Sequence, residues 1–70
     1  MAKVITNNIR RLRFDQDEMT QKALADLVGV SRQTIVAIEK GKYSPSLEVA
    51  FKIAEVFTMA LDDVFQYKEQ

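Results

Sequence analysis

The sequence predicts an all-α domain in which five short helices pack around one core. The chain has 70 residues, a length that suits a single small domain. Its two glycines and one proline lie at Gly29, Gly41 and Pro45, and the long stretches that they delimit have the length of helices. Apolar residues in those stretches recur three or four positions apart, which is the spacing of one helix face. Because no linker or repeat interrupts this pattern, residues 1–70 are predicted to form one domain.

The first helix is predicted to begin at Asn7 or Asn8, since asparagine side chains can accept hydrogen bonds from the first backbone N–H groups of a helix. Ile9 and Leu12 follow at a spacing that places them on one face. Arg13 stands four residues after Ile9 and shares that face, so its guanidinium is expected to lie against the core.

The second helix is predicted over residues 21–28, with Thr20 as its N-cap. Gly29 can adopt the left-handed conformation that ends such a helix. Ser31 then caps a third helix over residues 32–40, which the next glycine ends.

A fourth helix is predicted over residues 46–57, and a short fifth helix over residues 61–66. The inward face of the fourth helix consists of Leu47, Ala50, Ile53, Ala54 and Phe57. The two ends of the chain contain the β-prone segments KVIT and FQYK, which could pair with each other as a two-stranded ribbon.

The composition argues against an enzyme. The chain contains no cysteine and no histidine, which excludes disulfides, thiolate or imidazole metal sites and the usual nucleophile–histidine pairs. It also lacks a glycine-rich phosphate loop, so we expect no cofactor, and no small-molecule ligand is evident. The N-terminal segment has no apolar region typical of a signal peptide, and no apolar run reaches the length that a membrane span needs. These features predict a cytoplasmic protein with no membrane partner.

The ten basic and ten acidic residues cancel, but they are unevenly distributed. Residues 1–14 carry four basic side chains and no acidic one, and residues 31–52 carry four basic side chains against two acidic ones. A neutral protein with separated charges can present a positive face to phosphates. Ordinary scatter of charge is an equally good explanation of this distribution by itself.

The segment from Gln21 to Ile38 has the pattern of a DNA-binding helix-turn-helix. The turn needs a residue that tolerates a positive φ, and the close approach of the two helices needs a small residue. Counted from Gln21, the small residue Ala25 is fifth, Gly29 is ninth and the branched Ile35 is fifteenth. Leu24, Val30 and Ile38 supply the remaining apolar groups that would hold the angle between the helices. In this motif the second helix enters the major groove of DNA.

The segment TQKALADLVGVSRQTIVAIEKGKYSPSLEVAFKIAEVF resembles the phage-repressor/Cro (XRE-like) family, and within it the short single-domain members typified by the cytolysin repressor. The resemblance extends from Asn7 to Tyr67. It implies a five-helix homodimer that binds a pseudo-palindromic operator in double-stranded DNA and most often represses transcription. Such a regulator would be associated with the nucleoid.

The resemblance also implies roles for individual residues. The base-reading positions of the family fall on Arg32, Gln33, Val36 and Ala37, with Thr34 near a phosphate or a base. Its phosphate-binding positions fall on Gln21, Lys40, Lys42, Tyr43 and Ser44. The chemistry agrees, since Arg suits guanine, Gln suits adenine, and small apolar side chains suit the thymine methyl group. Tyr43 has a second interpretation, in which its ring packs over the loop.

Arg13 and Glu39 are predicted to form a structural ion pair between the first and third helices. Both residues lie next to apolar faces, so each needs a partner of opposite charge. The resemblance implies the same pair, although the segment FDQDEMTQ is one residue longer than usual. Thr58 stands where the family usually has a glycine, and Ala60 where it usually has a capping residue, which puts the geometry of the fifth helix in question.

The fifth helix and the C-terminal tail carry more apolar side chains than a core of this size needs. Val64, Phe65 and Tyr67 are therefore predicted at a two-fold dimer interface. An alternative function is a protein-interaction module, such as an antitoxin-like or co-regulator subunit. Such a module would present large apolar or aromatic anchors on the third helix. The residues expected on its outer face offer none.

Overall fold

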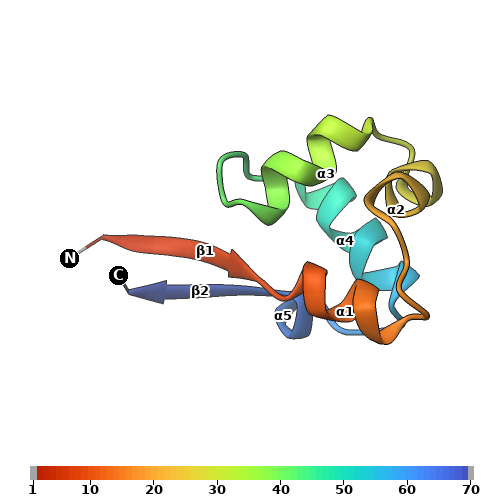
Figure 1. Cartoon of the computed structure of the whole chain (residues 1–70). Coiled ribbons are helices and arrows are strands. Elements are labelled where there is room, and N and C mark those ends of the chain that lie inside the picture. Colours follow the sequence, from red (N-terminus) through yellow and green to blue (C-terminus); the bar gives the residue numbers. More distant parts are fainter. Residues whose placement is uncertain (1, 70) are drawn as a thin grey trace.

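The computed structural model describes residues 2–69 and shows a helical body from which a two-stranded ribbon projects (Figure 1). The elements follow in the order β1 (Lys3–Asn7), α1 (Ile9–Asp15), α2 (Gln21–Val28), α3 (Arg32–Glu39), α4 (Leu47–Val56), α5 (Leu61–Val64) and β2 (Phe65–Glu69). The five helices agree with the prediction. The fold is nevertheless mostly helical and not purely α, because the two ends of the chain form a sheet. No helix in residues 2–69 is long and apolar enough to cross a bilayer.

Three of the helices have an N-cap residue with a hydroxyl side chain. The Oγ1 atom of Thr20 accepts a hydrogen bond from the backbone N–H of Ala23 at the start of α2. Ser31 and Ser46 cap α3 and α4 in the same way, accepting from the third residue after each serine. These caps satisfy N–H groups that have no partner inside the helix, so each start is specified locally by one residue.

The ribbon consists of β1 and β2, which pair in antiparallel register from Lys3 opposite Glu69 to Asn7 opposite Phe65. Helix α5 ends at Val64, two residues before the predicted end, and the chain turns directly into β2. The predicted ribbon of KVIT and FQYK is thus present, whereas the helix predicted through Gln66 ends earlier, because Phe65 and Gln66 pair with β1 at the other end of the sequence. The ribbon places both termini at its far end (Figure 1).

Two connections contain residues with a positive φ that are not glycine. The longer segment after α1 turns through Asp17 and Glu18, at φ values of 57° and 53°. Thr58, which stands at the position of a usual glycine, has φ 56°, and the Met59 N–H next to it donates to the carbonyl of Ala54 at 3.0 Å. The longer segment and the replacement of the usual glycine by Thr58 thus both place residues in the left-handed region. That conformation is strained for a β-branched residue such as threonine.

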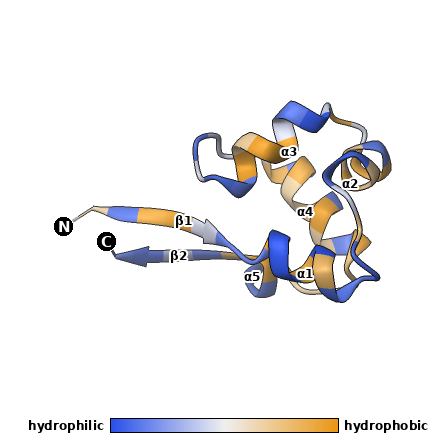
Figure 2. Ribbon diagram, in the orientation of Figure 1, coloured by the Kyte–Doolittle hydropathy of each residue, from blue (hydrophilic) through white to orange (hydrophobic). Residues whose placement is uncertain are grey.

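The core lies between the helices, with α4 at its centre packing against α2 and α5 (Figure 2). Its largest fully buried side chains are Ile9, Leu24, Ile35, Ile38, Ile53 and Val64. Leu47, predicted on the inward face of α4, is instead exposed at the first position of that helix. The placement of Val64 corrects the predicted dimer interface. Its exposed fraction is 0%, so it belongs to the core of the single chain and is not available to a second copy. The short helix α5 directs this side chain inward, where the apolar pattern alone could not distinguish core from interface.

Candidate nucleic-acid interface

Helices α2 and α3 and the turn between them are held by local hydrogen bonds. Gly29 has φ 87° and ends α2, and the N–H groups of Gly29 and Val30 both donate to the carbonyl of Ala25, at 2.8 and 3.0 Å. The side chain of Ala25 is almost fully buried. A larger side chain at this position would have no room, and the turn would lose the geometry that sets α3 against α2.

Helix α3 is divided into an inward and an outward face. Ile35 and Ile38 are buried in the core, whereas Arg32 and Gln33 are exposed at the start of the helix. Val36 and Ala37 are half-buried, and Val36 does not pack against the core cluster. The outward face therefore carries a guanidinium, an amide and two small apolar groups, a combination that suits the edges of DNA bases.

Thr34 differs from its neighbours on this helix. Its Oγ1 atom lies 2.8 Å from the Oγ atom of Ser31, and its backbone N–H donates to the same serine oxygen. Its hydroxyl group is therefore engaged with the helix cap. Of the five predicted base-reading residues, Thr34 is the one whose polar side-chain group has a hydrogen-bond partner among residues 2–69.

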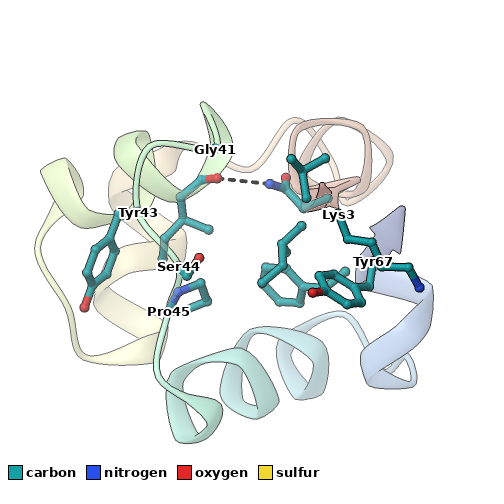
Figure 3. Close-up of a pocket in the computed structure, with 11 residues that line it drawn as sticks. Lys3, Gly41, Tyr43, Ser44, Pro45 and Tyr67 are labelled. Carbon is teal, nitrogen blue, oxygen red and sulfur yellow. Dashed lines mark hydrogen bonds between the residues drawn. The ribbon is translucent and has the colours of Figure 1, made fainter. Parts of the chain in front are cut away.

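The loop after α3 carries the predicted phosphate-binding residues Lys40, Lys42, Tyr43 and Ser44, and all of them are exposed. Gly41 has φ 74°, and the N–H of Lys42 donates to the carbonyl of Ala37 at 2.9 Å, which holds the loop against the end of α3. Figure 3 shows the ring of Tyr43 turned away from Lys3 and Tyr67. The ring is 53% exposed and does not pack into the core.

Basic groups without a carboxylate partner lie on and just after α3, and also elsewhere in residues 2–69, at Lys3, Arg10, Arg11 and Lys68. Within residues 2–69, Arg32, Lys40 and Lys42 have no carboxylate at ion-pair distance. By contrast, Lys22 pairs with Asp26 at 3.0 Å, and Lys52 pairs with Glu48 at 3.4 Å. Three of these unpaired cations thus lie on and just after α3, where a phosphate backbone could bind them.

An ion pair joins α1 to the end of α3. Arg13 binds Glu39 through two hydrogen bonds, Nε to Oε2 at 2.7 Å and Nη2 to Oε1 at 3.0 Å. Its third contact is from Nη1 to the carbonyl of Met19 at 2.8 Å, which ties down the longer segment before α2. The two side chains are only 15% and 9% exposed. This bidentate pair ties the end of α3 to α1.

The side chain of Gln21, a predicted phosphate-binding residue, has a hydrogen-bond partner within the chain. Its Nε2 atom donates to Oε1 of Glu39 at 3.3 Å, so the first residue of α2 joins the ion-pair network. Sequence reasoning missed this link because Gln21 and Glu39 are 18 positions apart.

Sequence reasoning also missed the role of Asn7, which it treated only as a helix start. Its Oδ1 atom accepts from the N–H of Ile9 at 3.1 Å, and its Nδ2 atom donates to the carbonyl of Ile38 in α3 at 3.0 Å. A capping residue was the available signal, but its second partner depends on the tertiary structure. No group of three acidic, histidine or cysteine side chains within residues 2–69 lies close enough to hold a metal ion.

Comparison with known proteins identifies the motif. A family profile described as Helix-turn-helix matches residues 9–64. The chain belongs to this family, of the XRE type. Helix α3 is therefore the recognition helix of a helix-turn-helix protein, and α2 is the helix that supports it.

Relatives of this helix-turn-helix protein are transcriptional regulators by name. An HTH-type transcriptional regulator of Methanocaldococcus jannaschii is 59% identical over 73% of this chain and 77% of its own length. The HTH-type transcriptional regulator YgzD of Bacillus subtilis is 45% identical over 91% of this chain and 96% of its own. The cryptic phage CTXphi transcriptional repressor RstR of Vibrio cholerae is 32% identical, over 94% of this chain and 59% of the repressor.

A solved structure supports the same assignment. The transcriptional regulator VanUg superimposes with a TM-score of 0.80 and 25% identity, over 100% of this chain and 92% of the other. Because the likeness extends over the whole chain, it includes the ribbon as well as the helices. The protein is a DNA-binding regulator of the helix-turn-helix class.

Proposed function

We propose that this regulator is a repressor that binds a pseudo-palindromic operator as a homodimer. The observation that carries the proposal is the outward face of α3, where Arg32 and Gln33 are exposed on a helix whose opposite face is sealed into the core. Because these two side chains are exposed, they do not contribute to the packing of the core. Both can form paired hydrogen bonds with base edges in the major groove.

Base reading is assigned to the first two turns of α3. Arg32 suits the two acceptors of guanine, and Gln33 suits the donor–acceptor pair of adenine. Val36 and Ala37 lie one turn further along and would contact thymine methyl groups. Thr34 takes a lesser part, because its hydroxyl group already binds Ser31.

Phosphate binding is assigned to the two ends of the motif. Lys40 and Lys42 supply unpaired charge in the loop, and Tyr43 and Ser44 supply hydroxyl groups beside them. Gln21 contributes at the start of α2, where backbone N–H groups favour an anion. These contacts would fix the orientation of α3 on any duplex and would leave the choice of sequence to Arg32 and Gln33.

The dimer is assigned to the ribbon and the start of α5. Ile5 and Tyr67 face each other across the ribbon and are 45% and 66% exposed. They border a shallow apolar hollow of about 690 Å³ together with Leu61 and Phe65. A two-stranded ribbon is marginally stable alone, and in the described part of the chain no third strand pairs with either of its outer edges. A second copy of the chain would cover this surface. The proposed interface therefore retains Phe65 and Tyr67 from the predicted set and excludes the buried Val64.

Repression is proposed from the name of the relative RstR and from a simple mechanism. A dimer seated in two successive major grooves, with its recognition helices about 34 Å apart, would occlude a promoter without any further domain. It would act in the cytoplasm, on the nucleoid.

Selection of bound sequences from random duplexes tests the proposal. We expect enrichment of an inverted repeat, and light scattering should give the mass of a dimer, which Tyr67→Glu should reduce to that of a monomer. The double variant Arg32→Ala and Gln33→Ala should lose the enrichment while retaining weak binding to all duplexes. A wild-type protein that enriches no sequence would contradict the proposal and would favour a protein partner instead.

A further inference from the structure

Asn7 lies at the junction between the ribbon and the helical body. It is the last residue of β1, and its side chain contacts two helices at once. The Oδ1 atom accepts from the N–H of Ile9 at the start of α1, at 3.1 Å, and the Nδ2 atom donates to the carbonyl of Ile38 near the end of α3, at 3.0 Å. The half-buried amide thus uses its acceptor for α1 and its donor for the recognition helix.

The bond to Ile38 is the one hydrogen bond that joins the ribbon to α3 in the described part of the chain. On both sides of this hydrogen bond, a hollow separates the ribbon from α3 and the loop that follows it. One hollow, of about 320 Å³, lies between Lys3 and Tyr67 on the ribbon and the segment 41–45 after α3 (Figure 3). The other, of about 390 Å³, lies between β1 and the end of α3. Direct contact between the ribbon and α3 is therefore sparse away from this bond, although Phe65 at the base of β2 packs against the core cluster.

We propose that Asn7 is a positioning residue that sets the angle between the ribbon and the recognition helix, and thereby the operator spacing that the dimer prefers. The inference rests on the proposed function, in which the ribbon carries the dimer contacts and α3 carries the base contacts. Any rotation of the ribbon about its junction would move the two recognition helices of a dimer relative to each other. The hydrogen bond to Ile38 restrains that rotation at the point where the strand leaves the body.

Substitution of Asn7 by aspartate separates its two contacts. A carboxylate keeps the acceptor for the N–H of Ile9, where a negative charge at a helix start is favourable, but it cannot donate to the carbonyl of Ile38. Asn8→Asp is the matched control. Its Nδ2 atom donates to the carbonyl of Asp63 at 3.0 Å, so this variant adds the same charge and removes the same kind of bond, toward α5 and not toward α3.

The measurement is binding to three synthetic operators with identical half-sites, whose spacers are the selected length, one base pair shorter and one base pair longer. Wild-type protein and Asn8→Asp should discriminate strongly between them. Asn7→Asp should reduce that discrimination by about threefold to tenfold, the size expected for one lost hydrogen bond. Its preference among single-base changes within a half-site should stay as in the wild type, which a general loss of folding would not produce.

Two results would overturn the proposal in different ways. Equal spacer discrimination by Asn7→Asp and wild type would refute the role of Asn7 and leave the proposed function standing. A wild type that binds without any spacer preference would refute the proposed dimer, and the role of Asn7 with it. If Asn7→Asp fails to fold, Asn7→Ser replaces it, because serine can cap α1 but is too short to reach Ile38, and the same two outcomes decide.

Discussion

The helix-turn-helix and the ribbon are stabilised in opposite ways. In the segment 20–40, a threonine and a serine cap the helices, a glycine makes the turn, and a buried alanine allows the close approach, so that each feature depends on neighbours a few residues away. The ribbon joins residues from the two ends of the chain and leaves Ile5 and Tyr67 exposed. Local contacts are thus enough to define which side chains of α3 point outward. The ribbon, by contrast, gains much of its stability from contacts between residues that are far apart in the sequence.

The largest effect is expected from Glu39→Ala, which tests how far the motif is independent of the rest of the chain. Removing the carboxylate leaves Arg13 largely buried without its partner and also frees Gln21, so the free energy of unfolding should fall by about 3–5 kcal/mol. Denaturant melts measure it. Asp26→Ala, which breaks the exposed pair with Lys22, is the control and should cost below about 1 kcal/mol.

A double-mutant cycle tests the pair itself. Arg13→Met and Glu39→Leu together should recover much of the stability that either substitution loses alone, because no stranded charge remains. Simple additivity of the two effects would show that the bidentate contact has little energetic weight, and that α3 is held by its buried isoleucines instead.

The next effect concerns the outward face of α3. Gln33→Ala should cost about 1–3 kcal/mol of specific affinity per half-site and relax the preference at one base position, because one bidentate contact is lost. Its thermal unfolding should match that of the wild type, since the side chain is exposed. Binding titrations on the selected operator and on a scrambled duplex measure the specific and the non-specific affinity. Gln16→Ala is the control outside the motif. A preference that stays unchanged at every position would remove Gln33 from the base contacts.

Lys42→Ala should have a smaller and less specific effect. Loss of one phosphate contact should weaken binding to specific and non-specific duplexes alike and reduce the slope of log K against log salt by about one unit per occupied site. Lys52→Ala, whose charge is already paired with Glu48, should leave the slope in place. A changed sequence preference with an unchanged slope would instead make Lys42 a base-reading residue.

The smallest effect is expected at Thr58, in the connection that leads to α5 and the ribbon. Thr58→Gly should raise the free energy of unfolding by about 0.5–1 kcal/mol, because glycine adopts a φ of 56° without steric strain. Asp17→Gly, at φ 57°, should gain less, since aspartate tolerates the left-handed region better than threonine. Thermal melts of the two variants compare them, and a destabilised Thr58→Gly would show that the threonine side chain contributes a contact of its own.

The sequence by itself determined the helical elements and the division of α3 into two faces. Caps at Thr20, Ser31 and Ser46 and the glycine at 29 act within one or two turns, so their effect can be inferred from neighbouring residues. Apolar spacing placed Ile35 and Ile38 inward for the same reason, which left Arg32 and Gln33 outside.

Only the tertiary structure decided which apolar residues of the C-terminal segment lie in the core and what the polar side chains at the junctions bind. Val64 and Tyr67 look alike in a hydropathy pattern, yet one is fully buried and the other is 66% exposed, because the end of α5 turns the chain into β2 between them. Gln21 and Asn7 found partners 18 and 31 positions away. Such contacts depend on how the whole chain closes, and no local pattern of caps or spacing contains that information.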